Sequence, residues 1–399
     1  MPDWRAEVDA YIDSIADELR ETRRHLHAHP EPSGAEFRTA ELLAGRLGEA
    51  GIPRRLIPSG RGLVAGPGGD EPGPKFAFRA DIDALRIQDL KDVPYRSTRE
   101  GMMHACGHDA HATMALGAAL ALWGCRESFP RPVPWRAIFQ PAEETGEGAH
   151  EMIAAGAVEG VRAVVALHVD PDLGVGMVAQ RTGAMTACCQ DLHVTVRGVG
   201  GHAARPHQAI DPVAVAVQLV SAVYQFVPRS VDSREAAVVT FGMIHAGASP
   251  NVIPDTVELR GTIRTLSWAA AARVEDRLRQ IARGLAEAGG TAIEVRVEKG
   301  VGAVINDPAV TALCVRAASE VVGADRVVPI PLPSMGGEDF AGYLDHAPGC
   351  LLRLGVASDD RPRTLLHSPH FDIDERALAF GAKVLAHSVL HMAGLSATP

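Results

Sequence analysis

The chain has 399 residues, of which 46% are hydrophobic and 22% are charged, a composition typical of a globular protein large enough for more than one core. The 39 lysines and arginines are outnumbered by 49 aspartates and glutamates, and the resulting net charge of −10 argues against a nucleic-acid partner. No apolar run reaches the roughly 18 residues that a membrane helix needs.

The N-terminal segment carries acidic residues from its third position and lacks a continuous apolar stretch. This pattern is typical of an amphipathic helix and not of a signal peptide, so we expect a cytoplasmic protein that does not contact the membrane. The six cysteines are scattered and form no CxxC pair, which fits a reducing compartment and argues against a disulfide framework.

Short apolar runs alternate with helical patterns in the first half of the chain, which is typical of an α/β domain. We expect strands over 75–83, 135–144 and 161–170, each ending in polar residues, and helices over 111–124 and 148–158. Ligands of open α/β sheets gather at the carboxyl ends of the strands. Polar side chains from separate strands should therefore converge on one edge of the sheet: Asp81, Asp83, Glu143, Glu144 and His168.

The pattern changes after residue 181. Strand-like alternation over 191–198 and 255–266 accompanies helical patterns over 211–227 and 269–289, which predicts a small α+β domain of two strands and two helices. The remaining sequence returns to the first domain and ends in a loop and a helix. We therefore expect residues 1–185 and 298–399 to form a mixed-sheet domain with helices on both faces, and residues 186–297 to form an inserted domain.

The stretch MMHACGHDAHATM, residues 102–114, holds a cysteine, three histidines and an aspartate. Taken alone, its histidines and aspartate could be helix caps or surface groups. Together with Glu144, His168 and a histidine near the C-terminus, however, Cys106 and His108 supply the sulfur, nitrogen and oxygen donors that bind zinc, manganese, cobalt or nickel. The sequence therefore predicts a metal site.

Two adjacent glutamates, Glu143 and Glu144, follow the second expected strand in the segment PAEETGEG. Neighbouring carboxylates repel each other unless a cation lies between them or one of them takes up a proton. One glutamate can thus bind a metal while the other acts as a base. A solvated acidic turn is the alternative.

Several segments occur in the order found in the M20 metallopeptidase family: RADIDAL, HACGHDAH, QPAEETGEGA, ALHV, GGHAARPHQAIDP, NVIPDTVELRGTIRT, GGEDF and LHSPHFDIDE. They most resemble its amidohydrolase branch, which includes aminoacylases, hippurate hydrolases and auxin-conjugate hydrolases. The resemblance runs from RRHLHAHPE to FDIDE, nearly the whole chain. It implies that 1–185 and 298–399 form a catalytic metal-binding domain, and that 186–297 form a lid or dimerisation domain.

The resemblance also implies a dinuclear metal centre and the roles of single residues. Two divalent ions, zinc, manganese, cobalt or nickel, would be bound by Cys106, His108, Glu144, His168 and His367. Glu143 would be the general base, and Asp83 would support catalysis by orienting a metal ligand.

For substrate binding the resemblance implies His202, Asn251 and Arg264. His202 would reach the active site, often from a partner subunit, which implies a homodimer through the inserted domain. Asn251 and Arg264 would hold the carboxylate of the substrate, since a guanidinium can bind a carboxylate through two hydrogen bonds. The alternatives are a simple glycine turn around His202, and solvated side chains for Arg264 and Arg260.

The expected reaction is hydrolysis of the amide bond of an N-acyl amino acid by a metal-activated water, with Glu143 as the base. A dipeptidase or carboxypeptidase on the same scaffold is the alternative among enzymes. A catalytically silent module that binds a metal or a ligand is the alternative from another class. The presence of Glu143 beside Glu144 argues against the silent module, which needs no base.

Overall fold

The computed structural model describes residues 4–69, 73–360 and 363–395. Its contacts divide the chain into two compact units. Unit 1 comprises Met1–Met185, Ile305–Leu332 and Asp339–Pro399, and unit 2 comprises Thr186–Val304 and Pro333–Glu338. The boundary expected at residue 298 falls inside strand β13 (Ala292–Lys299), because this strand pairs along its whole length with strand β8 of unit 2.

Unit 1 is built around an eight-stranded mixed sheet in the order β1-β2-β4-β3-β5-β16-β6-β15. Its four central strands are parallel: β4 (Trp135–Gln140), β3 (Lys75–Asp81), β5 (Val161–Gly174) and β16 (Gly349–Ala357). Three outer strands bring in the antiparallel pairings: β1 (Arg54–Leu56), β2 (Leu63–Ala65) and β6 (Val178–Gln180). The edge strand β15 (Val327–Pro329) pairs with β6 in parallel. The mixed sheet predicted for this part of the chain is confirmed.

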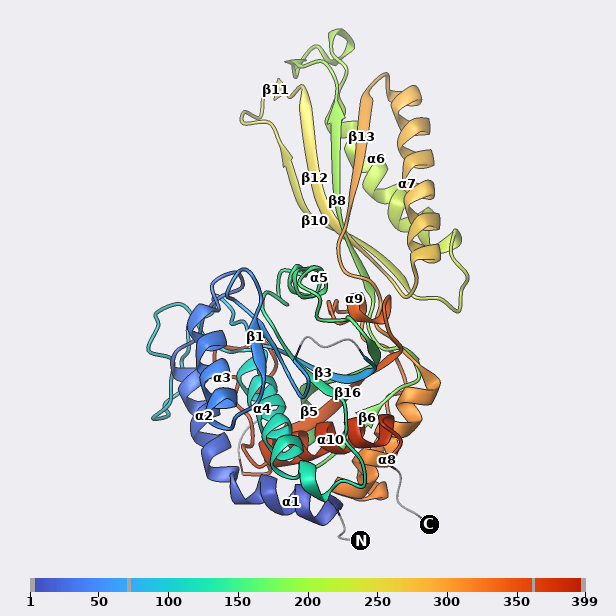
Figure 1. The fold of residues 1–399 in the computed structure, drawn as a ribbon. Coiled ribbons are helices and arrows are strands. Elements are labelled where there is room, and N and C mark those ends of the chain that lie inside the picture. The colour runs from blue at the N-terminus through green and yellow to red at the C-terminus, as the bar shows by residue number, and fades with distance from the viewer. Residues whose placement is uncertain (1–3, 70–72, 361–362, 396–399) are drawn as a thin grey trace. The chain divides into compact units, whose positions relative to one another are not determined.

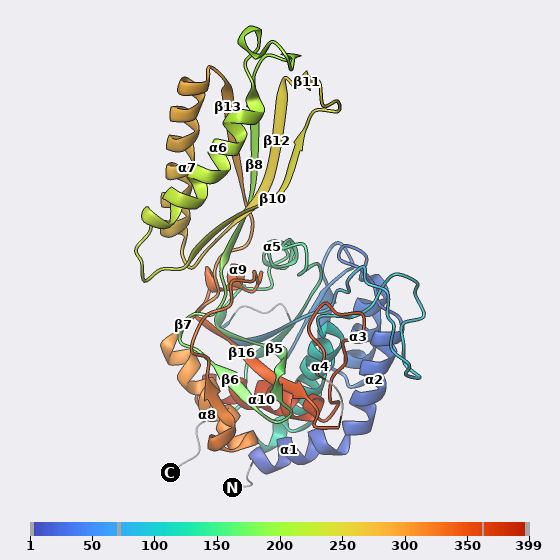
Figure 2. The ribbon, with the colours of Figure 1, turned by 180° about the vertical axis from the view of Figure 1, so that it is seen from behind.

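Helices cover both faces of this sheet, as expected (Figures 1 and 2). One side carries α1 (Trp4–Ser14), α2 (Ala16–Ala28), α4 (His108–Gly124) and α10 (Ala377–Met392). The other side carries the shorter helices α5 (Gly148–Ala154) and α9 (Ala341–Leu344). Two further helices contact strands toward the two edges of the sheet. Helix α3 (Phe37–Glu49) lies beside β1 and β2, and α8 (Pro308–Val322) lies beside β16, β6 and β15.

Helix α4 lies at the centre of the main core and is buried from His108 to Leu122. Its sequence is rich in alanine and leucine on every side, which is the pattern of a helix that is enclosed all round. A Cβ atom added at Gly117 would lie 2.9 Å from Leu19 Cδ1 and 3.0 Å from Ala382 Cβ, so this glycine permits the close approach of α4 to α2 and α10. The packing fixes the position of the first residue of α4, His108.

Unit 2 contains a four-stranded antiparallel sheet in the order β10-β12-β8-β13. Its strands are β8 (Cys188–Arg197), β10 (Ala237–Ala246), β12 (Thr256–Thr265) and β13 (Ala292–Lys299). Helices α6 (Pro212–Phe226) and α7 (Trp268–Gly289) form a second core with alternate apolar residues of these strands. The prediction of an inserted α+β domain is confirmed.

The prediction of only two strands in this sheet is wrong, because both edge strands were missed. In β10, a bulge between Phe241 and Met243 shifts the alternation of side chains. Strand β13 does carry a signal, since Ile293, Val295 and Val297 alternate with polar residues and face the core.

The remaining elements are short. Two antiparallel pairs are β7 (Gly183–Ala184) with β14 (Ile305–Asn306), and β9 (Gly201–His202) with β11 (Val252–Ile253). The 3₁₀ helices are η1 (Arg126–Ser128), η2 (Pro206–Gln208), η3 (Val227–Arg229) and η4 (Ala324–Arg326). Among the helices within the described ranges, none combines the length and the apolarity that crossing a membrane requires.

Candidate metal centre and active site

The predicted ligands of unit 1 come from segments that meet near the ends of the parallel strands. Cys106 lies two residues before His108, which begins α4, and Glu144 lies in the loop that follows β4. His168 lies within β5, because this strand continues to Gly174. The strand ends and the start of α4 therefore bring together donors that are far apart in the sequence.

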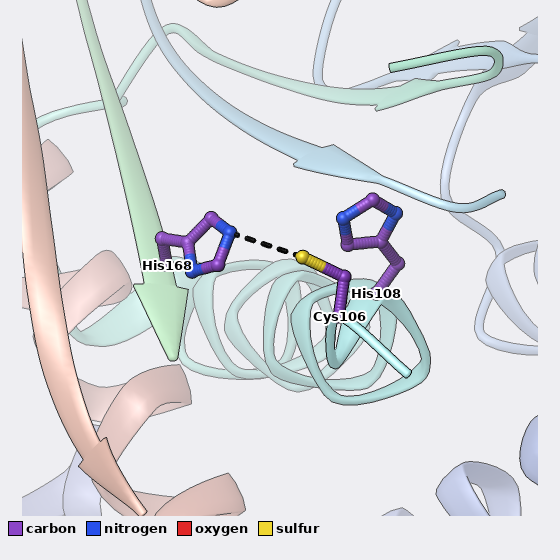
Figure 3. Close-up of side chains that lie close together, drawn as sticks. All are labelled: Cys106, His108 and His168. Carbon is purple, nitrogen blue, oxygen red and sulfur yellow. Dashed lines mark hydrogen bonds between the residues drawn. The ribbon is translucent and has the colours of Figure 1, made fainter. Parts of the chain in front are cut away.

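Three of these donors form a buried group. The side chains of Cys106, His108 and His168 point toward one another (Figure 3), and their donor atoms all lie within 4.8 Å of one another. Cys106 Sγ is 3.5 Å from His168 Nε2. Burial raises the pKa of the Cys106 thiol to about 12, so a nearby cation would be needed to hold it as a thiolate at neutral pH.

The hydrogen bonds of both histidines leave one nitrogen free to act as a donor to a metal. His108 Nδ1 lies 3.0 Å from the carbonyl oxygen and 3.0 Å from Oδ1 of Asp83, and His168 Nδ1 lies 2.8 Å from the carbonyl oxygen of Val169. Because these oxygens accept hydrogen bonds, Nδ1 carries the hydrogen in the neutral form of each ring and Nε2 keeps its lone pair. Both Nε2 atoms are thus available as metal ligands.

A second group of predicted ligands joins Cys106 to Glu144 and His367, whose donor atoms also lie within 4.8 Å of one another. Glu144 Oε1 is 3.4 Å from His367 Nε2 and 4.0 Å from His108 Nε2. The Glu144 carboxylate raises the pKa of His367. The two donor groups share Cys106, so all five predicted ligands are gathered in one place.

Two buried atoms of the site indicate that these residues can bind a metal. His108 Nε2 and Glu144 Oε1 are both buried, and neither has a hydrogen-bond partner among the described residues. Buried polar atoms in folded proteins almost always have a partner, so such atoms indicate a bound group. A thiol, imidazole nitrogens and a carboxylate are the donor set of zinc and related transition metals. The residues fit a metal centre.

The backbone has an uncommon conformation at two points of this site. Within the described ranges, Ala142 with φ 52° and His367 with φ 61° are the non-glycine residues with positive φ. Ala142 directly precedes Glu143, and its N–H donates to Glu36 Oε1 at 2.8 Å. The His367 N–H donates to the carbonyl oxygen of Ala105 at 2.8 Å. Such conformations are kept where surrounding contacts enforce them, often at functional sites.

The proposed base and its supporting aspartate lie in the same cluster. Donor atoms of His108, Glu143 and Glu144 lie within 4.8 Å of one another. Asp83 is buried and, besides its bond to His108, accepts hydrogen bonds from Ser33 Oγ at 2.7 Å and from the Glu144 N–H at 3.1 Å. The Asp83 carboxylate therefore contacts two predicted ligands, the imidazole ring of His108 and the backbone N–H of Glu144.

Residues behind the ligands form a buried network that includes Asp81, one of the side chains expected at this edge of the sheet. Asp81 Oδ1 lies 2.6 Å from His111 Nδ1, and Asp81 Oδ2 accepts from Arg79 at 2.6 Å. His111 Nε2 in turn accepts the Val169 N–H at 2.9 Å. His111 is therefore engaged at both nitrogens and supports the strand that carries His168.

Arg79 also bonds a residue whose role was not predicted. Arg79 Nη2 donates to Asp339 Oδ1 at 2.6 Å, and Asp339 further accepts from Gln140 Nε2 and from the Ala149 N–H. Asp339 belongs to the segment GGEDF, one of the segments that resemble the M20 family. This resemblance is the sequence signal that could have identified Asp339 as a functional residue.

The three predicted substrate-binding residues lie in unit 2. His202 and Asn251 are neighbours, because β9 pairs with β11 and the Ala203 N–H donates to the carbonyl oxygen of Asn251 at 3.1 Å. Arg264 lies eight positions beyond the first residue of β12, Thr256, so at roughly 3.3 Å per residue it is roughly 26 Å from that end of the strand. Since Asn251 lies before this first residue, one chain does not bring Asn251 and Arg264 to the same carboxylate.

The chain is similar to known proteins over most of its length. The model of a family described as peptidase family M20/M25/M40 matches residues 77–391. An N-acetyl-L-cysteine deacetylase of Bacillus subtilis is 39% identical over 92% of this chain and 86% of its own length. Thermostable carboxypeptidase 2 of Saccharolobus solfataricus is 35% identical over 95% of this chain and 96% of its own length.

A solved structure shares both units of the fold. The crystal structure of the YXEP protein of Bacillus subtilis, a dinuclear metal-binding peptidase of the M20 family, superimposes with a TM-score of 0.84 at 33% identity. The match covers 96% of this chain and 99% of that chain. With the family model matched from residue 77 to residue 391, the chain belongs to the peptidase family M20/M25/M40.

Proposed function

We propose that this metal-dependent hydrolase cleaves the amide bond of N-acyl amino acids, releasing a carboxylic acid and a free amino acid. The observation that carries the proposal is the pair Glu143 and Glu144 beside buried donors, of which His108 Nε2 and Glu144 Oε1 lack hydrogen-bond partners among the described residues. The identity of 39% to an N-acetyl-L-cysteine deacetylase supports this substrate class.

The metal centre would be held by the five gathered donors, Cys106, His108, Glu144, His168 and His367. Two divalent ions bound there would supply Lewis acidity, which polarises the scissile carbonyl and acidifies water. Glu143 takes the proton from the attacking water and passes it to the leaving nitrogen, so that the amine leaves uncharged. Asp83 holds the His108 ring in the tautomer that keeps Nε2 unprotonated.

Substrate recognition would rest on the residues of unit 2. Arg264 would bind the carboxylate of the amino-acid part, because its half-buried guanidinium can form two parallel hydrogen bonds. His202 and Asn251 lie at the opposite end of the sheet from Arg264. We therefore propose that His202 and Asn251 act on the substrate of a partner subunit.

This proposal requires a homodimer, which would form through unit 2. Strand β10 is an edge strand and exposes three large apolar side chains, Val238, Met243 and Ile244, at 44%, 46% and 58%. An edge strand with exposed apolar residues can pair with another chain, and a second copy of the same strand is the simplest partner. The cytoplasmic location expected from the N-terminal segment stays a prediction, which cell fractionation would test.

The alternatives differ in the substrate that they need. A carboxypeptidase or dipeptidase on this scaffold, favoured by the 35% identity to a thermostable carboxypeptidase, would act on peptides. A silent module would bind metal and hydrolyse nothing. Against the silent module stands Glu143, which lies beside the proposed ligands His108 and Glu144 although the other two donor groups already contain all five ligands.

The test is an assay of chelator-treated enzyme reloaded with manganese, zinc, cobalt or nickel. The panel contains N-acetyl and N-benzoyl amino acids, dipeptides with a free amino group, and N-acyl amines that lack a carboxylate. We expect hydrolysis of the N-acyl amino acids with at least one metal, and much slower cleavage of the other two classes. Preferred cleavage of dipeptides would establish the peptidase alternative, and metal binding without any hydrolysis would establish the silent module.

A further inference from the structure

A wholly buried arginine, Arg23 in α2, contacts three carboxylates. Its Nε lies 2.9 Å from Asp109 Oδ2, its Nη2 lies 2.9 Å from Asp372 Oδ1, and its Nη1 lies 3.4 Å from Glu375 Oε1. The exposed fraction of the Arg23 side chain is 0%. Removing a charge from water is costly, so a buried guanidinium is stable only where such partners surround it. None of these four residues belongs to the proposed ligands or is the proposed base.

The carboxylates that meet at Arg23 come from the two chain segments that hold the proposed ligands His108 and His367. Asp109 is the next residue after His108, in the first turn of α4. Asp372 and Glu375 lie between His367 and the start of α10. The guanidinium thus ties α2 to both segments at once.

Further hydrogen bonds close this cluster around Asp109 and Asp372. His27, one turn after Arg23 on α2, places its Nδ1 2.7 Å from Asp109 Oδ2. Tyr95 donates from its hydroxyl to Asp372 Oδ2 at 2.8 Å. Both oxygens of Asp372 are therefore engaged, one by Arg23 and one by Tyr95, and its position is fixed from two sides.

We propose that Arg23 is a positioning residue of the metal centre, which sets the spacing between His108 and His367 by holding Asp109 and Asp372 in one buried ion cluster. The guanidinium donates from Nη2 to Asp372 and is paired through Nε with Asp109 at 2.9 Å, so one planar group contacts both carboxylates. A lysine ammonium is a single point charge on a flexible stem and cannot contact both from the same two positions. The inference rests on the proposed function, because it takes His108 and His367 to be metal ligands.

The neighbouring arginine provides a matched control. Arg24 also bonds Glu375, with Nε 2.9 Å from Oε1 and Nη2 2.6 Å from Oε2. Its side chain, however, is 40% exposed, and its ion pair is with Glu375. Arg24→Lys therefore makes the same chemical change on the same helix and at one of the same carboxylates, without touching the contacts to Asp109 and Asp372.

The experiment measures the Zn²⁺ affinity of the full chain after chelation, by competition with a chromophoric chelator. Melting temperatures of the metal-free proteins are measured alongside. We expect Arg23→Lys to weaken Zn²⁺ binding by about 10 to 100-fold, as is typical for residues that support metal ligands, and Arg24→Lys to leave it unchanged. A purely structural role would lower the melting temperature of Arg23→Lys while the folded protein kept the wild-type Zn²⁺ affinity, and this result would overturn the inference.

Two further outcomes are separable. If wild type itself binds no Zn²⁺, the proposed metal centre fails, and with it the role of Arg23. If Arg23→Lys does not fold, Asp372→Asn decides in its place, because it removes the negative charge that Arg23 Nη2 contacts at 2.9 Å and leaves only the longer contact of Arg23 with Glu375, at 3.4 Å, to the segment of His367. We expect the same loss of Zn²⁺ affinity for Asp372→Asn, and wild-type affinity in this variant would overturn the inference.

Discussion

Replacing Asp83 by asparagine should weaken metal binding although Asp83 is not itself a proposed ligand. The carboxylate accepts three hydrogen bonds, from His108 Nδ1 at 3.0 Å, from Ser33 Oγ at 2.7 Å and from the Glu144 N–H at 3.1 Å. All three partners are donors. Asparagine keeps the shape but offers a single acceptor oxygen, and its NH2 group is itself a donor.

The size of the effect follows from the bond that is lost. If the NH2 group faces His108, two donors meet, and the ring loses a charge-assisted hydrogen bond worth about 1.5 to 3 kcal/mol. At about 1.4 kcal/mol per factor of ten, the metal affinity should fall by about 10 to 100-fold. If the NH2 group faces Ser33 instead, it also faces the Glu144 N–H, and the backbone of this second ligand must shift.

The measurement is a competition titration of chelated protein with zinc or manganese against a chromophoric chelator, together with the turnover of an N-acyl amino acid. Asp172→Asn serves as the control, since the Asp172 side chain is 67% exposed on β5 and pairs with Arg363. We expect the control to match wild type. Wild-type metal affinity in Asp83→Asn would refute the reasoning, because His108 would then not depend on this carboxylate.

Three more expectations concern the base, the carboxylate site and a buried acid. Glu143→Gln should keep wild-type metal content by elemental analysis but lose several orders of magnitude in turnover, because the base is lost and the ligands are not; substantial remaining activity would exclude Glu143 as the base. Arg264→Lys should lower kcat/KM for an N-acyl amino acid by about 10 to 100-fold and barely affect the matching N-acyl amine, whereas equal losses on both would exclude a carboxylate contact. Burial raises the pKa of Glu36 from 4.5 to about 7 in the folded protein, so the native state binds the proton more tightly and stability is lost as the pH rises from about 4.5 through 7. In urea unfolding of metal-free protein, the stability of wild type relative to Glu36→Gln should therefore fall by up to about 3 kcal/mol between pH 5 and pH 8, and a difference that does not change with pH would contradict the raised pKa.

The strands and ligands that the sequence predicted share a local signal. Strand β4 reads as an apolar run that ends before Glu143 and Glu144, and the segment around Cys106 and His108 concentrates donor atoms within a few positions. Both signals lie within about ten residues. Such patterns can be recognised in the sequence because nearby residues determine both the buried strand and the start of the helix.

What the sequence could not show depends on contacts between distant segments. The ion pair of Arg23 with Asp109 joins positions 86 residues apart, and no local pattern connects them. His27 is buried and contacts Asp109, which lies 82 residues further along the chain. Asn251 and Arg264 fall within one motif, yet the extended strand between them carries them to opposite ends of the sheet. Nearness in a motif therefore did not imply nearness in space.

The enclosure of α4 also constrains how this scaffold can diverge. From His108 to Leu122 every residue of the helix is buried, and Gly117 already lies at the limit of approach to Leu19 and Ala382. Most substitutions in this helix would create either a clash or a cavity in the largest core of the protein. Substitutions that change the substrate, in nature or in laboratory evolution, should therefore be rare in the helix that begins at His108. They should be found in the loops and in the inserted unit, where side chains can change without displacing this helix.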